Sequence, residues 1–153
     1  MAPLIPFLLI ALIAVAADLP SRKYLNLAAI KIMAAAAEAE MQKHKVQVTI
    51  CIVDESGNLL FLQKADGAAL TTIQFAQRKA RQAALYRKPS KSAQDALTGG
   101  NMAVLAFPDS FPNQGGVPII VDGQTIGAIA CSGAPSEVDE AIAQFAVDAL
   151  LKK

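Results

Sequence analysis

Histidine, tryptophan and an excess of either charge are what this chain lacks. Its 153 residues include one His, two Cys and no Trp. A zinc site built from Cys and His alone needs four ligands, and three candidates are present, which argues against such a site. Lys and Arg total 14 and Asp and Glu total 13, so the net charge is +1. This balance argues against a globally basic nucleic-acid-binding protein and against an acidic tail.

Aromatic residues are scarce, although the chain is rich in apolar ones. Hydrophobic residues make up 54% of the sequence and aromatic residues 5%, so alanine and the aliphatic residues dominate. A chain of this length corresponds to one domain. It has enough apolar side chains to bury a core, which excludes a disordered chain.

The first 17 residues contain no charged side chain, and the run from Phe7 to Ala17 is entirely apolar. This run is short for a membrane-spanning helix, which needs about 20 residues, but it suits the apolar part of a signal peptide, about 7–15 residues long. Ala14-Val15-Ala16 has the small-x-small form of a cleavage site. We therefore predict a signal peptide at 1–16 and a single domain at 17–153, periplasmic or secreted by a bacterium. An uncleaved interfacial anchor, the only membrane contact expected, and a buried N-terminal strand or helix stay open as alternatives, because the segment lacks Lys and Arg.

Hydrophobic periodicity predicts alternating helices and strands in the rest of the chain. Helical spacing over 25–43 predicts a first helix. A two-residue period over 46–52, a turn and a return strand at 59–64 predict a hairpin. A second helix is expected from a Thr71 or Thr72 cap to about residue 86, and a short helix at 90–97.

The C-terminal part repeats this arrangement after a long loop. Residues 99–116 contain several glycines and prolines and predict a loop, with a brief strand at 102–105 as an option. Asp122-Gly123 favours a tight hairpin between strands at 117–121 and 124–131. A last helix is expected from Ser136. Two hairpins with helices between them predict an α+β fold, with an antiparallel sheet flanked by helices.

Three sequence blocks, in order, resemble the GlcG/HbpS-like family, often called the haem-degrading domain family. The first is DGA at 66–68 with QRKARQAA at 77–84 and RKPS at 87–90. The second is GGVPI at 115–119, and the third is GAIACSGAP at 127–135 with DEA at 139–141. The resemblance covers about residues 25 to 150.

This resemblance implies a profilin-like sandwich with a five-stranded antiparallel sheet, and a homo-oligomer, either a tetramer or an octamer. It also implies haem as a ligand, since the family includes extracellular haem-binding proteins. One position departs from the family pattern. The family usually has Thr or Ser where this chain has Gln82, and in some members a hydroxyl in this region is linked to the haem.

The candidate ligand-binding residues are Arg78, Lys79, Gln82, Gly115 and Gly116. Arg78 and Lys79 belong to a basic stretch over 78–91, which could pair with haem propionates or another carboxylate. A solvated helix face is the alternative explanation of that stretch. The two glycines would allow a ligand or a neighbouring subunit to approach the backbone closely, or they could simply make the loop flexible.

Three residues are candidates for binding a metal: His44, Glu137 and Glu140. Neutral imidazole can be an axial haem ligand, but a His at a helix C-terminus also suits a solvated position. Glu137 and Glu140 share one helix face and could hold iron. Acids in a first helical turn are also stabilised by the helix dipole, and Ser136 with Asp139 resembles a capping arrangement.

Cys51 and Cys131 fall on different expected strands, and either a disulfide or two separate buried thiols is compatible with the pattern. We find no pairing of a nucleophile with a base, which favours a binding protein over an enzyme. The sequence thus predicts an exported, oligomeric protein that binds haem or a related tetrapyrrole for sequestration or sensing. The alternatives are an enzyme or accessory subunit that binds a small organic acid, and a structural oligomer without a ligand. No nucleic-acid partner is expected.

Overall fold

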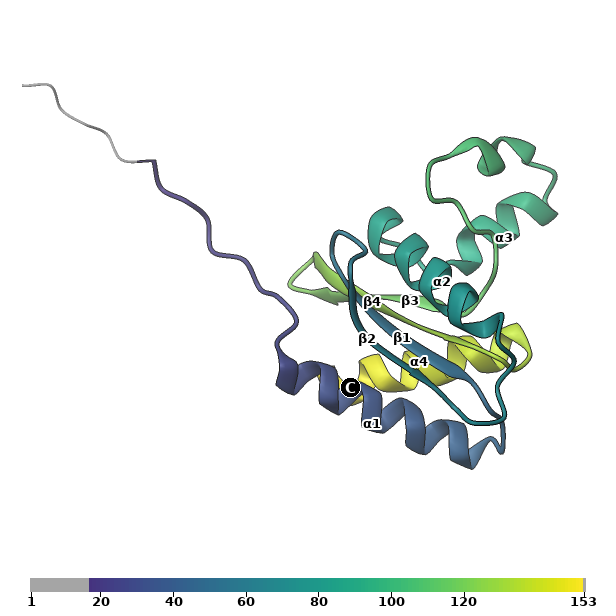
Figure 1. Cartoon of the computed structure of the whole chain (residues 1–153). Helices are drawn as coiled ribbons and strands as arrows, with labels where there is room; N and C mark the ends of the chain where they lie inside the picture. The colour runs from purple at the N-terminus through teal and green to yellow at the C-terminus, as the bar shows by residue number, and fades with distance from the viewer. Residues whose placement is uncertain (1–16, 153) are drawn as a thin grey trace, which may run out of the picture.

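Helices and strands alternate along the computed structural model, which describes residues 17–152 (Figure 1). The elements are α1 (Leu27–Lys43), β1 (Thr49–Asp54), β2 (Leu59–Lys64), α2 (Thr72–Tyr86), α3 (Lys91–Thr98), the short 3₁₀ helix η1 (Met102–Ala106), β3 (Gly116–Val121), β4 (Gln124–Ser132) and α4 (Ser136–Leu151). The predicted signal peptide at 1–16 lies outside the described residues.

The four strands of the described chain form one sheet in the order β2-β1-β4-β3, and every neighbouring pair is antiparallel. Each outer strand is joined to its inner neighbour by a tight turn. In the β3–β4 turn both Asp122 and Gly123 have positive φ, at 50° and 76°. A type I′ turn requires this backbone conformation, so the two residues fulfil the role expected from the sequence.

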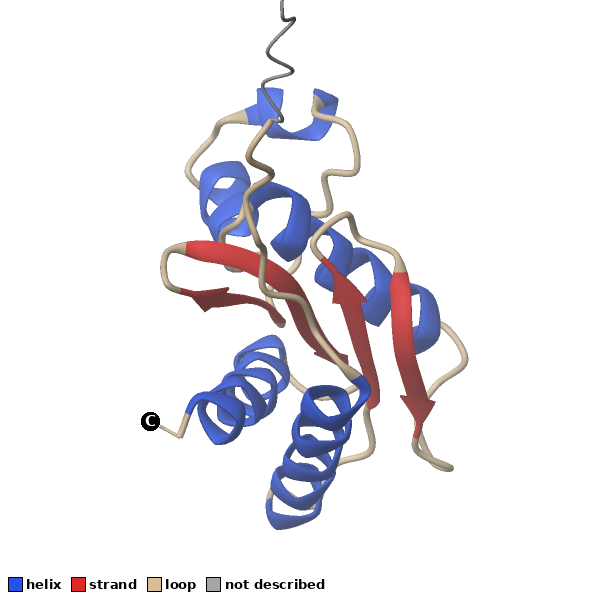
Figure 2. Cartoon of the chain, turned by 90° about the vertical axis from the view of Figure 1, so that its left-hand side faces the viewer, coloured by secondary structure: helices blue, strands red, loops and turns tan. Residues whose placement is uncertain are grey.

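The sheet separates two layers of helices (Figure 2). Helices α1 and α4 cover one face and build a core of large aliphatic side chains, including Met33, Ile52 and Ile129. Helix α2 covers the other face, where the core is nearly all alanine, with Ala80 and Ala83 packed against Ala128 and Ala130. Helix α3 and η1 extend from this second layer as a projecting lobe.

The predicted α+β fold with an antiparallel sheet flanked by helices is confirmed, but the strand number differs. The described residues form four strands rather than the five that the family resemblance implied. The optional strand at 102–105 is wrong, since Met102–Ala106 is a 3₁₀ helix. There the Asn101 side chain accepts a hydrogen bond from the Ala103 N–H at 3.2 Å. The segment also lies in the lobe, away from any sheet edge with which it could pair.

Two of the expected helix caps are absent. Thr71 precedes α2 without a side-chain cap, and the Thr72 hydroxyl instead donates to the Ala69 carbonyl at 2.6 Å. Helix α4 begins at Ser136 as expected, but Pro135 precedes it without a side-chain cap. The first helix begins two residues later than the periodicity predicted, because the Asn26 side chain accepts from the Ala29 N–H at 2.9 Å and caps α1 there.

Both cysteines are buried free thiols on adjacent strands. Cys51 pairs with Ala130 in the register of β1 and β4, and Cys131 pairs with Ile50. Neighbouring positions of a strand point to opposite faces, so Cys51 lies in the alanine core and Cys131 in the aliphatic core. The sheet therefore separates the two sulfurs, and the alternative of two separate thiols is correct.

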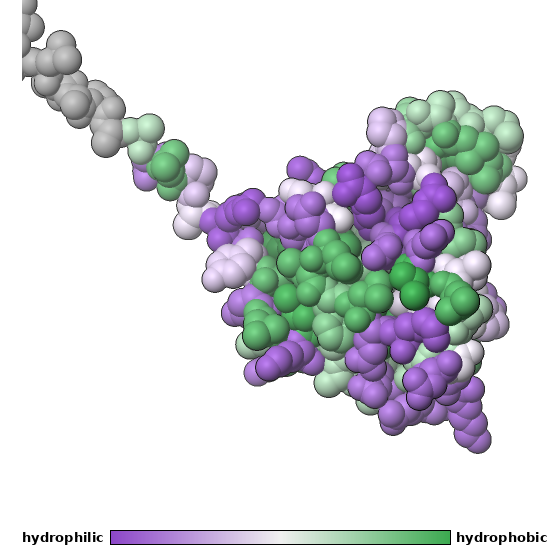
Figure 3. All heavy atoms as spheres, in the orientation of Figure 1, coloured by the Kyte–Doolittle hydropathy of each residue, from purple (hydrophilic) through white to green (hydrophobic). Residues whose placement is uncertain are grey.

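Strand β2 is an open edge of the sheet and carries exposed apolar side chains. Leu59 and Leu60 of β2 and Ile32 of α1 are exposed. Figure 3 shows apolar side chains gathered in a band over β2, between α1 and α2. We call Leu59 and Leu60 the β2 patch. Within residues 17–152, no helix is both long and apolar enough to cross a membrane.

Candidate functional site

A cavity of about 170 Å³ lies between the C-terminal half of α2, α3 and the segment that follows α3. We call it the loop pocket. It is lined by Gln82, Tyr86, Lys88, Pro89, Ser92, Ala93, Ala96, Asn101, Val104, Phe107 and Ser110. Ligand sites in proteins are typically concave, mostly apolar and provided with a few polar groups, and this cavity has that character.

The end of α2 positions the polar groups of the loop pocket. Arg87 adopts a left-handed conformation with φ 55°, so the helix stops at Tyr86. The chain then turns sharply, and Lys88 and Pro89 return to line the cavity. The Tyr86 hydroxyl donates to the carbonyl of Pro108 at 2.5 Å. A phenol and an ammonium group thus lie together at the rim.

Gln82 is deeper in the pocket and only 5% exposed. Its side-chain oxygen accepts a hydrogen bond from the Phe111 N–H at 2.9 Å. Ser110, one residue earlier, has a buried hydroxyl without a hydrogen-bond partner in the described chain. An unpaired buried hydroxyl costs free energy, and a bound ligand or a water molecule would supply its missing partner.

Residues 107–113 form a flap over the pocket, and two arginines of α2 hold it. Arg81 makes a two-pronged ion pair with Asp109, with N–O distances of 2.8 and 3.1 Å. Hydrogen bonding from Arg81 holds the pKa of Asp109 below its ordinary value. The Arg78 guanidinium lies over the Phe111 ring, 4.2 Å from its centre, and Phe75 meets the same ring edge-on. Both arginines are therefore occupied by the flap.

Lys79 is buried about two helical turns before Tyr86 on α2, and it does not line the loop pocket. Its ammonium group binds the Asp139 carboxylate at 2.8 Å and the Cys131 carbonyl at 3.2 Å, and both charged side chains are 2% exposed. The other Asp139 oxygen accepts from the Ala134 N–H at 3.0 Å. Burial raises the pKa of Asp139, and the hydrogen bond from Lys79 acts in the opposite direction. Lys79 thus ties α2 to α4 and lies away from the pocket.

Gly115 and Gly116 serve the contact between α2 and β3. A Cβ on Gly116 would lie 2.3 Å from the Lys79 carbonyl oxygen, and one on Gly115 would lie 2.8 Å from the Lys79 Nζ. Gly115 also has a φ of 128°, which side chains rarely tolerate. Buried Ser90 adds to this junction, because its hydroxyl donates to the Asn113 carbonyl at 2.7 Å and accepts from the Gly116 N–H at 2.9 Å. The close approach that the glycines permit is made by α2 itself.

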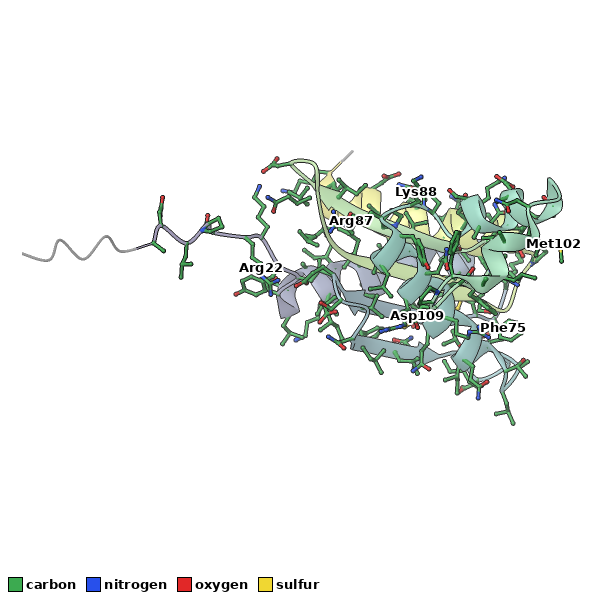
Figure 4. All side chains as sticks on the ribbon, turned by 90° about the horizontal axis from the view of Figure 1, so that it is seen from above. Arg22, Phe75, Arg87, Lys88, Met102 and Asp109 are labelled. Carbon is green, nitrogen blue, oxygen red and sulfur yellow. The ribbon has the colours of Figure 1, made fainter. Side chains whose placement is uncertain are left out.

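The basic stretch over 78–91 does not form one cationic surface. Arg78 and Arg81 hold the flap and Lys79 is buried, whereas Lys91 pairs with Asp95 one turn along α3 at 2.6 Å. In the described part of the chain, Arg87 and Lys88 have no carboxylate within ion-pair distance. Figure 4 shows these two near one end of α2, with Phe75 near the other. They are the cations of this stretch that remain available to an anionic ligand.

Of the three candidate metal ligands, His44 lies at the end of α1, whereas Glu137 and Glu140 lie on α4. His44 ends α1, with its Nε2 3.1 Å from the Glu40 carboxylate, and it does not line the loop pocket. Glu137 is exposed, whereas Glu140 has one buried oxygen without a partner, and burial raises its pKa. Among residues 17–152, no three His, Cys, Asp or Glu side chains cluster closely enough to hold a metal ion.

The sequence pointed to Gln82 as a site residue and, within the basic stretch over 78–91, to Lys88, but it did not identify Tyr86 or Ser110 as neighbours. The only signal for them was their position: a Tyr at a helix end before Lys-Pro, and a Ser in a loop rich in glycine and proline. Their convergence depends on the path of the chain from α3 through η1 to β3. The hydrophobic periodicity of the sequence does not reveal that path.

The fold and the pocket together define a class of protein: an α+β domain with a single antiparallel sheet and a pocket closed by a loop on one helical layer. The family model described as haem degrading protein HbpS-like matches residues 25–148. The chain belongs to this family, which confirms the resemblance found in its three sequence blocks.

Individual relatives agree with this assignment. Protein GlcG of Escherichia coli strain K12 is 39% identical over 98 residues, 64% of this chain and 73% of GlcG. The crystal structure of HbpS matches with a TM-score of 0.78 and 30% identity, covering 90% of this chain and 99% of that one. The structure of a complex between PduOC and haem matches with a TM-score of 0.76 and 25% identity, covering 83% of this chain and 95% of that one. Membership of this family and the likeness to a haem complex support haem binding.

Proposed function

We propose that this protein binds haem, or a related tetrapyrrole, at the loop pocket. The observation that carries the proposal is the combination of groups there: apolar walls, a free cation and a phenol at one rim. A haem site needs these three kinds of group, for the ring, the propionates and the iron. The family assignment and the PduOC–haem complex give independent support.

Each part of the pocket has a role in this proposal. Val104, Phe107 and Ala96 would contact the ring, and Lys88 would pair with a propionate at the exposed rim. The buried Ser110 hydroxyl faces a cavity in which a ligand group could complete its hydrogen bonding. Bound haem would supply an iron with axial positions and a planar ring bearing two carboxylates.

Haem binding would require the flap to move. The cavity of about 170 Å³ is smaller than the 300–1,000 Å³ typical of sites for drug-sized ligands, and haem is at least of that size. The contacts that hold the flap are the Arg81–Asp109 pair, the packing of Arg78 and Phe75 on Phe111, and the hydrogen bonds Tyr86–Pro108, Phe111–Gln82 and Ser90–Asn113. These contacts tie residues 107–113 to α2 and to the start of α3, and they would have to break for the flap to open.

We also propose where the protein is located and how it assembles. Residues 1–16 would direct export, and the mature chain would form a homo-oligomer, a tetramer or an octamer, that sequesters or senses haem. The β2 patch supports association, because an open sheet edge with exposed leucines readily pairs with another chain. Light scattering of the chain and of Leu59→Asp would test this. A monomeric parent, or an unchanged oligomer in the variant, would contradict the assignment of that surface.

Haemin titration, followed by the Soret band, tests the proposed ligand. Ala96→Phe places a ring in the cavity and should abolish the haem-induced spectral change. Ala39→Phe, on an exposed position of α1, is the matched control and should leave it intact. Lys88→Ala should weaken binding about two- to fivefold, which corresponds to one exposed ion pair. The absence of a Soret shift in the parent protein, or equal titrations for the two phenylalanine variants, would overturn the proposal.

A small organic acid is the second candidate ligand. The closed cavity of about 170 Å³ favours it, since a molecule of that size could enter without movement of the flap. Lys88 would pair with the carboxylate, and Ser110 would hydrogen-bond to it. A thermal-shift screen of small carboxylic acids tests this, with Lys88→Ala as the specificity control. Stabilisation of the parent but not of the variant would support a small acid. If neither an acid nor haemin shifts Tm, a structural oligomer becomes the better reading.

A further inference from the structure

The groups able to bind haem iron through a side chain are few in this chain. Protein ligands of haem iron are His, Cys, Met and Tyr. The described residues of these four types are His44, Cys51, Cys131, Met33, Met41, Met102, Tyr24 and Tyr86. Of these eight side chains, only one lines the loop pocket.

Most of these side chains are excluded by their surroundings. The two cysteines and Met33 are fully buried in the cores on either side of the sheet, and Met41 is nearly so. Burial raises the pKa of Cys51 to about 12, which disfavours the thiolate that would bind iron. His44 lies at the end of α1, in the layer of helices on the other face of the sheet from the pocket.

The remaining three differ in where they lie. Tyr24 is in the N-terminal segment, beside a separate cavity formed with α4 and β4. Met102 is 65% exposed and does not line the loop pocket. Figure 4 shows it at the outer end of the projecting lobe. Tyr86 is half-buried and lines the pocket, two residues before the free cation Lys88.

Resting on the proposed function, we infer that the Tyr86 phenolate is the side-chain ligand of the haem iron. Gln82 lies one helical turn before Tyr86 on α2, and both side chains line the loop pocket. Residues four apart share a helix face, so Tyr86 lies on the side of α2 that faces the pocket. The amide of Gln82 is already bonded to the flap at Phe111.

Binding through Tyr86 couples the iron to the flap. In the closed state the Tyr86 hydroxyl donates its hydrogen to the Pro108 carbonyl. Ligation forms an oxygen–iron bond, breaks the O–H bond and releases one proton to solvent, without a change in oxidation state. The hydroxyl cannot donate to Pro108 once its proton has left. Haem binding and loss of one flap contact are therefore the same event, and the affinity for ferric haem should rise with pH.

The ferric haem complexes of four proteins test this inference: the parent, Tyr86→Phe, Tyr86→His and Tyr24→Phe. Because the chain has only two tyrosines, Tyr24→Phe is a matched control. Resonance Raman spectra should show iron–phenolate bands in the parent and in Tyr24→Phe, and no such bands in Tyr86→Phe. Tyr86→His should give the spectrum of histidine-ligated haem, which would show that residue 86 faces the iron.

The outcomes separate the inference from the function on which it rests. Phenolate bands that persist in Tyr86→Phe, or a parent complex without such bands, would overturn Tyr86 as the ligand while leaving haem binding intact. A Tyr86→His complex whose spectrum lacks histidine ligation would also overturn it. The absence of any Soret change in the parent would instead contradict the proposed function. We expect Tyr86→Phe to lose at least tenfold in affinity for ferric haem and to remain folded by circular dichroism.

Discussion

The buried ion pair between Lys79 and Asp139 allows the sharpest test of how the two helical layers are joined. We expect Asp139→Ala to destabilise the domain strongly, because the Lys79 ammonium would keep only the Cys131 carbonyl as a partner. Breaking a buried pair by removing one partner costs about 3–5 kcal/mol. The Ala134 N–H would also lose its acceptor, at about 1 kcal/mol. A loss of about 4 kcal/mol should lower Tm by roughly 10–20 °C in a domain of this size.

Urea denaturation of three variants measures this effect. Glu137→Ala removes an exposed acid from the same first turn of α4 and should cost far less than Asp139→Ala. The double variant Lys79→Met/Asp139→Leu removes both charges and should recover most of the loss, since well-packed apolar pairs often replace buried ion pairs without cost. The reasoning is refuted if Asp139→Ala is no worse than Glu137→Ala. It is also refuted if the double variant is less stable than Asp139→Ala.

Three further predictions concern the same junction and the two cores. Gly116→Ala should cost at least about 1–3 kcal/mol in urea denaturation, because its Cβ would meet the Lys79 carbonyl oxygen at 2.3 Å; an unchanged midpoint would contradict this. Ser90→Ala should cost about 1–3 kcal/mol, because the buried Gly116 N–H and the partly buried Asn113 carbonyl would lose this partner; Ser92→Ala, on the exposed side of α3, is its control. Burial raises the pKa of both the Cys51 and Cys131 thiols, so neither should react with DTNB at pH 8 until the protein unfolds, and a rapidly reacting thiol would refute their placement.

Much of the fold could be predicted because the hydrophobic period changes clearly along the chain. The helical stripe that becomes α1 and the alternation that becomes β1 differ in period, and Asp122-Gly123 specifies a turn. The strand option at 102–105 failed for a physical reason. A short apolar run becomes a strand only beside an open sheet edge, and these residues lie in the lobe, away from both edges.

The site was harder to predict, because the charge of a side chain does not reveal which residue it contacts in the fold. Arg78, Lys79 and Arg81 are near neighbours in the sequence, yet they contact different partners. These are the Phe111 ring, the buried Asp139 carboxylate and the exposed Asp109 carboxylate, respectively. Residues 78 and 79 point to different sides of α2, and the partners of the three residues lie 28 or more positions away along the chain. Asp139 appeared to be a dipole-stabilising acid at a helix start. Only the ion pair between α2 and the first turn of α4 shows it to be the counterion of a buried lysine.

The alanine layer between α2 and the sheet has a consequence for how this protein can vary. On the other face, large aliphatic side chains can exchange volume with their neighbours, so that one may shrink as another grows. Beneath α2 most of the core is already alanine, so few side chains can shrink, and enlargement of Ala80 or Ala83 would lift the helix from the sheet. Tyr86 and Gln82 would move with it. The distance between α2 and the sheet therefore sets the dimensions of the pocket. One methyl group added beneath α2, out of contact with the ligand, could change which ligand the pocket prefers.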